Sequence, residues 1–361
     1  MNNAYQYLKA FIITFFIPSI FWCQGINSPK YSNEFMNIGI GARSLGMSNS
    51  VITSTNDVTS GYWNPANLTK IESDLQVGLM HAEYFAGIAK YDYGAVAKNI
   101  DEKSAFAFSF LRFGVDNIPN TTELIDAQGN VNYDRISYFS ASDMAFLLSY
   151  GRELSDDFSI GGSAKIIHRK AGDFATAWGF GIDLSCSYKL NDWQFAAVAK
   201  DITSTFNIWD FHLTDEMITA FILTDNELPQ NHTELTLPRI IIGAGKTFNF
   251  KNELNLLVEI NTDITTDGSR NVLISGDPFS IDPHLGMEFN IKNIVFVRTG
   301  IGNIQKSPDL NGKNIFTIQP NIGIGLQLKG VALEYALTDI GDASVALYSN
   351  VFSLKFNLNP N

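Results

Sequence analysis

Hydrophobic and polar residues alternate regularly at the end of the chain. From Phe352 to Leu358, apolar side chains occupy every second position and polar side chains lie between them. This two-residue period is typical of a β-strand with one apolar and one polar face. Similar segments recur and predict about fourteen strands, near residues 75–82, 91–99, 104–113, 142–152, 158–170, 176–189, 193–201, 238–250, 253–263, 282–292, 294–303, 317–328, 330–338 and 347–358.

Short and long connections alternate between these segments. The short ones are Asn99–Lys103, Ser155–Asp157, Asn191–Asp192, Lys251–Asn252, Asn293 and Lys329–Gly330. The long ones lie near residues 83–90, 114–141, 202–237, 264–281, 304–316 and 339–346, with a shorter one at 171–175. Outer-membrane barrels place short turns on the periplasmic side and long loops outside. The pattern therefore predicts an all-β, antiparallel transmembrane barrel over residues 75–358, with both termini in the periplasm.

Composition favours a membrane barrel over a soluble β-sandwich, which is the alternative. Charged residues make up 17% of the 361 residues and hydrophobic residues 45%, whereas about 25% charged residues is usual in soluble domains. A spanning helix needs about 20 consecutive apolar residues, and the apolar residues here are interleaved with polar ones instead. The net charge of −12 argues against a nucleic-acid partner.

The first residues have the pattern of an export signal. Lys9 precedes an apolar segment from Ala10 to Trp22, which has the length of a signal-peptide core and is too short to span a membrane. We expect a signal peptide over residues 1–23, with cleavage near Cys23. Export without a later spanning helix is consistent with a barrel in the cell outer membrane.

Residues 24–74 precede the first predicted strand and do not alternate. They contain several glycines and an Asn-Pro-Ala turn sequence, which is typical of a compact, irregular segment. Because this segment would enter a wide barrel from the periplasmic side, we expect it to fold into the lumen as a plug, or hatch.

The sequence offers no convincing catalytic, cofactor or metal site. Gly243–Thr247 resembles the end of a phosphate-binding loop, but Ile240 occupies the position of the first required glycine. The five histidines are scattered and lack metal-ligand spacing. Asp263, Asp267, Asp277 and Asp282 do not match a calcium loop. We therefore predict a protein that is not an enzyme.

The predicted loop at 202–237 is unusually long and apolar. It contains Trp209, Phe211, Phe221 and Ile222, together with six acidic residues and no Lys or Arg. Exposed aromatic residues indicate contact with another apolar surface. The loop could fold over its own barrel, dock a protein partner, or contact the outer leaflet and its lipopolysaccharide.

A three-part motif lies in the predicted hatch. Residues 41–47 read Gly-Ala-Arg-Ser-Leu-Gly-Met, residues 56–59 read Asn-Asp-Val-Thr, and residues 62–68 read Tyr-Trp-Asn-Pro-Ala-Asn-Leu. This combination resembles the N-terminal signature of the PorV/PorQ family, a branch of the FadL-like outer-membrane barrels. Asn67 replaces the usual glycine of the family. The resemblance assigns these positions to the hatch: Arg43, Gly46, Asp57, Trp63, Asn64 and Pro65.

The resemblance implies a fourteen-stranded barrel with an N-terminal plug and a role in the type IX secretion system. PorV-like members bind the translocon barrel and collect secreted proteins through their C-terminal signal domains. They then deliver this cargo to the attachment machinery at the cell surface. FadL relatives instead transport hydrophobic small molecules. Our leading hypothesis is a secretion component that docks partners through the loop at 202–237, and the alternative is a FadL-like importer.

Overall fold

The structure is a computed structural model that describes residues 31–122, 124, 130–251, 253–308, 314–338 and 348–358. The predicted signal peptide at residues 1–23 lies outside these ranges. So do parts of the predicted loops at 304–316 and 339–346. None of the helices in the described ranges is long and apolar enough to cross a membrane.

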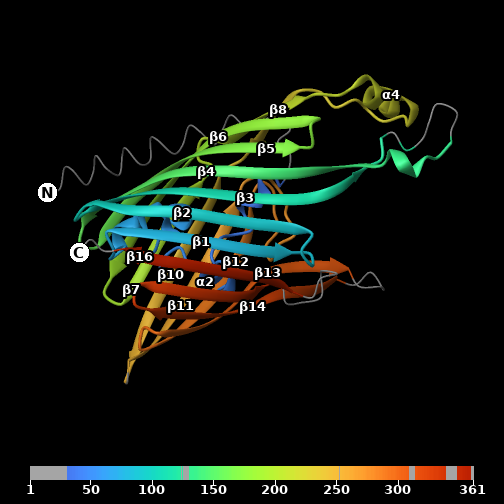
Figure 1. Ribbon diagram of the computed structural model, residues 1–361. Helices are drawn as coiled ribbons and strands as arrows, with labels where there is room; N and C mark the ends of the chain where they lie inside the picture. The colour runs from blue at the N-terminus through green and yellow to red at the C-terminus, as the bar shows by residue number, and fades with distance from the viewer. Residues whose placement is uncertain are drawn as a thin grey trace.

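Sixteen strands form one antiparallel sheet (Figure 1). They are β1 (Leu75–Tyr84), β2 (Ala89–Asp101), β3 (Ser104–Asn120), β4 (Ser137–Ser155), β5 (Phe158–Ala171), β6 (Ala175–Leu190), β7 (Trp193–Lys200), β8 (Thr205–Phe211), β9 (His232–Thr236), β10 (Arg239–Phe250), β11 (Leu254–Thr265), β12 (Ser280–Ile291), β13 (Val295–Pro308), β14 (Asn314–Leu328), β15 (Val331–Thr338) and β16 (Ser349–Leu358). β1 pairs with β16, and β5 pairs with β6, so the wall closes. The predicted fourteen-stranded antiparallel barrel, made of β1–β7 and β10–β16, is confirmed.

β8 follows the wall strand β7 after a short break, and β9 precedes the wall strand β10 after another. β7 pairs with the Leu184–Leu190 half of β6, and β8 continues along the Ala175–Phe180 half. Between β7 and β8, Asp201 and Ser204 both have a φ of 56°, which turns the chain while the pairing to β6 resumes. β9 pairs with β8 and leads into β10.

The two rims of the barrel differ in their connections. Turns of two or three residues join β2–β3, β4–β5, β6–β7, β10–β11, β12–β13 and β14–β15 at one end, the short-turn rim. Leu75 and Leu358 pair with each other at this rim. Most connections at the other end, the long-loop rim, are longer. The predicted loop at 114–141 is nevertheless shorter than expected, because β3 and β4 continue past the predicted strand ends and leave only residues 121–136.

Six short helices accompany the strands within the described residues. They are η1 (Glu34–Met36), α2 (Ala42–Gly46), α3 (Ser60–Trp63), η2 (Pro65–Lys70), η3 (Tyr133–Arg135) and α4 (Asp215–Leu223). The first four belong to residues 31–74, which we call the N-terminal segment. α4 lies beyond the ends of the strands, at the upper right of Figure 1.

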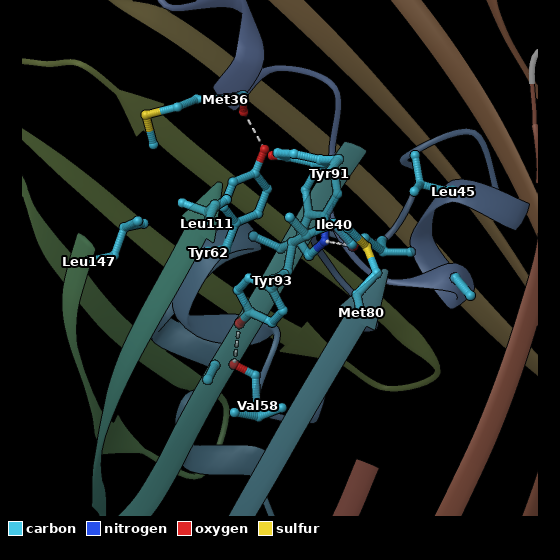
Figure 2. Close-up of a cluster of buried hydrophobic side chains, with 14 of the residues drawn as sticks. Met36, Ile40, Leu45, Val58, Tyr62, Met80, Tyr91, Tyr93, Leu111 and Leu147 are labelled. Carbon is cyan, nitrogen blue, oxygen red and sulfur yellow. Dashed lines mark hydrogen bonds between the residues drawn. The ribbon is translucent and has the colours of Figure 1, made fainter. Parts of the chain in front are cut away.

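The hydrophobic core lies inside the barrel. Outward side chains such as Leu333 and Phe352 are 55% exposed, as a lipid-facing wall requires. Many inward positions on β2 and β3 are alanine, which leaves space for the N-terminal segment. Ile40 of this segment is fully buried (Figure 2). Figure 2 shows Met36, Ile40 and Tyr62 gathered with strand residues Met80, Tyr91, Tyr93, Leu111 and Leu147.

Candidate functional site

The N-terminal segment runs through the lumen from one rim toward the other. Near the long-loop rim, Ser32 Oγ donates a hydrogen bond to Glu234 (2.6 Å), and Glu34 pairs with Arg270 (2.9 Å). Near the short-turn rim, Asn64 Nδ2 donates to Ser187 Oγ (2.8 Å). The described part of this segment therefore begins near the long-loop rim and reaches the short-turn rim.

Two charged residues of the sequence motif join a buried ionic cluster. Arg43 pairs with Glu288 (2.9 Å), and Asp57 pairs with Lys355 (2.6 Å). Arg298 connects these pairs, because it contacts Glu288 at 2.6 Å and Glu334 at 3.0 Å. Lys355 also lies 3.2 Å from Glu334. The cluster therefore contains three bases and three acids, and each charge has an opposite partner.

The cluster fixes the charge state of the N-terminal segment. Burial alone would raise the pKa of Asp57, but the charges of Lys355 and Arg43 hold that pKa well below its ordinary value. The Glu288 carboxylate similarly outweighs burial and raises the pKa of Arg43. Both groups are therefore charged at neutral pH. Removal of one charge from a buried cluster leaves its partner uncompensated, at a cost of about 3–5 kcal/mol.

The remaining motif residues make close backbone contacts. Trp63 Nε1 donates to the Ile40 carbonyl (3.0 Å), and Asn64 Nδ2 donates to the Ile52 carbonyl (2.7 Å). A Cβ atom added to Gly46 would lie 3.1 Å from Gly323 Cα on β14. Pro65 begins η2, which packs against β4 and β5. The six motif positions therefore lie together in the lumen, where they position the segment against the wall.

A cavity of about 1030 Å³ lies above the segment and opens toward the long-loop rim. Tyr62, Trp63 and Phe113 contribute aromatic surface to its lining. Arg169 and Arg239 also line it, and each has an acidic partner: Asp143 at 2.9 Å and Asp263 at 3.1 Å, respectively. The cavity thus combines apolar rings with neutralised charges.

Lys200 differs from the other cations of this cavity. Its side chain is 5% exposed, and Nζ lies 4.1 Å from the ring centroid of Tyr62 and 5.3 Å from that of Trp63. Within the described ranges, no carboxylate lies within 4.0 Å of this ammonium group. Cation–π contacts are weaker than a buried ion pair. The cavity therefore holds one cation that an anionic group could contact.

Residues 202–237, which were predicted to be one loop, contain two strands and a helix. β8, α4 and β9 form an arm at the long-loop rim. Trp209 lies on the inward face of β8: its Nε1 donates to Glu234 (2.7 Å), and Arg169 lies 5.0 Å from its ring. Trp209 was expected on an exposed docking surface. Side chains alternate along β8, however, so the neighbouring Ile208 takes the outward position and is 56% exposed.

The other predicted docking residues are divided between the strand and the helix. Phe211 stacks between Trp209 (6.1 Å between centroids) and His232 (6.0 Å). Phe221 is half-buried, whereas Ile222 is 64% and Leu223 is 72% exposed. The structure therefore does not bring the four predicted residues to one surface. Ile222 and Leu223 at the end of α4 are more exposed than Ile208, the outward apolar residue of β8.

Sequence reasoning missed several residues that complete these arrangements. Glu288, Arg298, Glu334 and Lys355 occupy inward positions on four strands, and Lys200 lines the cavity. These residues could have been recognised in the sequence as charged residues at the polar, lumen-facing positions of an alternating strand, as Lys355 is. Across the described ranges, no three His, Cys, Asp or Glu side chains are grouped as a metal site would require.

The fold is similar to that of two solved toluene transporters. The P. putida toluene transporter TodX is 13% identical, with a TM-score of 0.56, and the match covers 90% of this chain and 99% of that chain. The Ralstonia pickettii toluene transporter TbuX is 11% identical, with a TM-score of 0.53, and the match covers 89% and 99%. At these identities the likeness establishes the FadL-like fold alone.

The family comparison is more specific. No curated protein matches the chain. A family model described as type IX secretion system protein PorV matches residues 28–261. This range is more than half of the chain, and it includes the N-terminal segment, the arm and the wall up to β11. The chain therefore belongs to the family of the type IX secretion system protein PorV.

Proposed function

We propose that this chain binds the translocon, the C-terminal signal domains of secreted proteins, or both, and passes cargo to the surface attachment machinery. The family match carries the proposal, because it makes the chain an outer-membrane component of the type IX secretion system. PorV proteins and FadL-type barrels are not enzyme families. In this proposal the short-turn rim and both termini face the periplasm, since outer-membrane barrels keep short turns there.

The filled lumen supports a binding role over a conducting role. We propose that the N-terminal segment acts as a plug. A folded protein or an extended chain could pass only if the segment left the barrel, and this would separate Arg43 from Glu288 and Asp57 from Lys355. Separation of buried ion pairs is costly. Cargo would therefore contact the outer surface of the barrel and leave the lumen closed.

The arm supplies the docking surface in this proposal. Ile222 and Leu223 are exposed at the end of α4, and exposed apolar side chains of this kind are typical of interaction sites. Residues 202–237 contain six acids and no Lys or Arg, which favours a basic partner. In this proposal Trp209 and Phe211 do not contact the partner. They hold the arm to the wall instead.

The test is the double variant Ile222→Gln and Leu223→Gln, expressed in place of the natural protein. We expect a native pull-down from outer membranes to recover at least tenfold less translocon or cargo, since the variant loses the apolar contact. Thr219→Gln on the same helix is the matched control, because Thr219 is exposed but polar. A pull-down with the unaltered protein that contains neither translocon nor cargo would falsify the proposal.

The alternative is a FadL-like importer, and the cavity is the observation that favours it. Its aromatic lining and the lone Lys200 fit an amphipathic anion better than the hydrocarbon named for TodX. A strain without this gene separates the two functions. Loss of surface and secreted proteins supports secretion, whereas normal secretion with reduced uptake of a long-chain carboxylate supports import.

A further inference from the structure

Lys200 in the cavity carries a charge that its described neighbours compensate only in part. Its ammonium group can donate three hydrogen bonds, but it rests on the rings of Tyr62 and Trp63, at 4.1 and 5.3 Å from their centroids. No carboxylate of the described residues lies within 4.0 Å of it, and the side chain is 5% exposed. Burial of a cation without a polar partner is unfavourable. The ammonium group is therefore suited to contact an anion from the cavity side.

The strand register places a second cation beside Lys200. Arg239 on β10 is its direct cross-strand partner, and both side chains line the cavity. Arg239 pairs with Asp263 at 3.1 Å and donates a hydrogen bond to the side chain of Asn37. Its guanidinium group is therefore held by the protein itself. The two adjacent cations attract a negative group to this side of the cavity, and the ammonium group is the one left to bind it.

Two acids on neighbouring segments are already paired elsewhere. Asp183 on β6 and Asp201 after β7 contact Lys165 Nζ at 2.7 and 2.6 Å. Asp183 also accepts a hydrogen bond from the backbone N–H of Asp201 (2.7 Å). These contacts fix both carboxylates on Lys165, which is buried on β5. An anion for Lys200 therefore has to come from a ligand.

The lining of the cavity is polar as well as aromatic. Asn303 and Gln305 of β13 line it, and Gln305 Nε2 donates a hydrogen bond to Asn303 Oδ1 (2.6 Å). Asn37 and Asn49 of the N-terminal segment also belong to the lining. Amide side chains both donate and accept hydrogen bonds, so they suit a ligand with polar groups along its length. A hydrocarbon chain would bury them without partners, which costs free energy.

The size of the cavity admits a narrow chain and excludes a folded domain. Its volume of about 1030 Å³ is that of a large small-molecule pocket. The lining includes Trp63 of the N-terminal segment and reaches Thr317 of β14, near the long-loop rim. A single extended chain can therefore run from the rim to Lys200 above the segment. The ion pairs that hold the segment to the wall stay intact when it enters.

We infer that Lys200 binds the free C-terminal carboxylate of a polypeptide whose last residues enter the cavity from the long-loop rim. The carboxylate supplies the anion, and the peptide groups before it supply donors and acceptors for the polar lining. Capture of a C-terminal carboxylate is a recurring mode of peptide recognition. A fatty acid carries the carboxylate without the peptide groups, and an acidic side chain in a partner loop would bring two chain segments through the opening. That the polypeptide is a secreted protein rests on the proposed function.

Peptide binding to the full chain in lipid nanodiscs tests the inference. The probe is a synthetic peptide with the final residues of a secreted protein, labelled at its N-terminus and ending in a free carboxylate or in an amide. We expect the Kd from fluorescence anisotropy to be at least tenfold lower for the carboxylate, because hydrogen bonds between charged groups are the strong ones. Lys200→Met should abolish this difference, and Lys200→Arg should keep most of it. Lys103→Met in an exposed short turn is the matched control and should keep all of it.

Three outcomes would overturn the inference. Equal binding of the two peptides means that no carboxylate is recognised. A preference for the carboxylate that persists in Lys200→Met places the contact elsewhere. Dodecanoate that binds more tightly than the peptide and displaces it assigns the cavity to a fatty acid.

The pull-down described above separates this result from the proposed function. If it recovers cargo while the two peptides bind equally, only the inference about the cavity is wrong. If Lys200 distinguishes the two peptides while neither translocon nor cargo is recovered, only the proposed function is wrong.

Discussion

The ionic cluster in the lower half of the lumen and Lys200 in the upper half differ in how their buried charge is compensated. In the lower half, Arg43 and Asp57 of the N-terminal segment meet the wall in a cluster of three acids and three bases. In the upper half, Lys200 rests on the rings of Tyr62 and Trp63, and no carboxylate of the described residues lies within 4.0 Å of its ammonium group. The cluster therefore ties the N-terminal segment to the wall of the lower half. The upper half keeps open space and an available charge.

The substitution Glu334→Gln should have the largest effect on this comparison. It removes the carboxylate that Arg298 and Lys355 share, so the cluster keeps three bases but only two acids. One uncompensated buried charge costs about 3–5 kcal/mol. We expect the free energy of unfolding, measured with guanidinium in lipid vesicles, to fall by that amount. Glu102→Gln in an exposed short turn is the control. A loss below about 1 kcal/mol would show that the cluster does not hold the lower half together.

A smaller effect is expected where the segment touches the wall without charges. Gly161 on β5 lies so close to Pro65 and Ala66 that an added Cβ atom would overlap their backbone. Gly161→Ala should therefore lower the free energy of unfolding by about 1–3 kcal/mol. Gly94→Ala is the matched control, since Gly94 faces outward and the nearest atom would be 3.7 Å away. Equal stability of the two variants would mean that the segment moves easily.

The smallest effect, of opposite sign, is expected in the upper half. Lys200→Met keeps the length of the side chain and its contact with the rings but removes a buried charge that has no carboxylate within 4.0 Å among the residues the structure describes. The gain from avoided burial of charge exceeds the lost cation–π contact, so stability should rise by about 1 kcal/mol. The same guanidinium unfolding measures it, with Lys103→Met in a short turn as the control. A clear loss of stability would mean that Lys200 is satisfied as it stands.

Local sequence pattern was sufficient to predict the wall. Alternation over a few residues is a property of each strand, and it located all fourteen wall strands and the short turns between them. It was wrong about the length of the loop at 114–141. Toward the long-loop rim, the outward positions of β3 and β4 are mostly polar, so the apolar signal ends although the pairing from Ile118 to Phe139 continues.

The interior could be predicted only in part. The motif identified Arg43 and Asp57, but their partners on β12 and β16 lie 245 and 298 residues away. Only the closed register of the barrel brings such positions together. Trp209 was misplaced for a related reason, because its orientation depends on the strand that follows the break after β7. The plug and the periplasmic position of the termini stay predictions.

The contact between Asp57 and Lys355 also constrains when the molecule can become stable. Lys355 lies in the last strand, and Asp57 precedes the first. Contacts between such distant parts of a chain form late in folding, because a large loop must close first. An incompletely synthesised chain would leave Asp57 unpaired and β1 without its neighbour. The native ionic cluster thus exists only in chains that have been made to the end, and truncated products would remain open to periplasmic proteases.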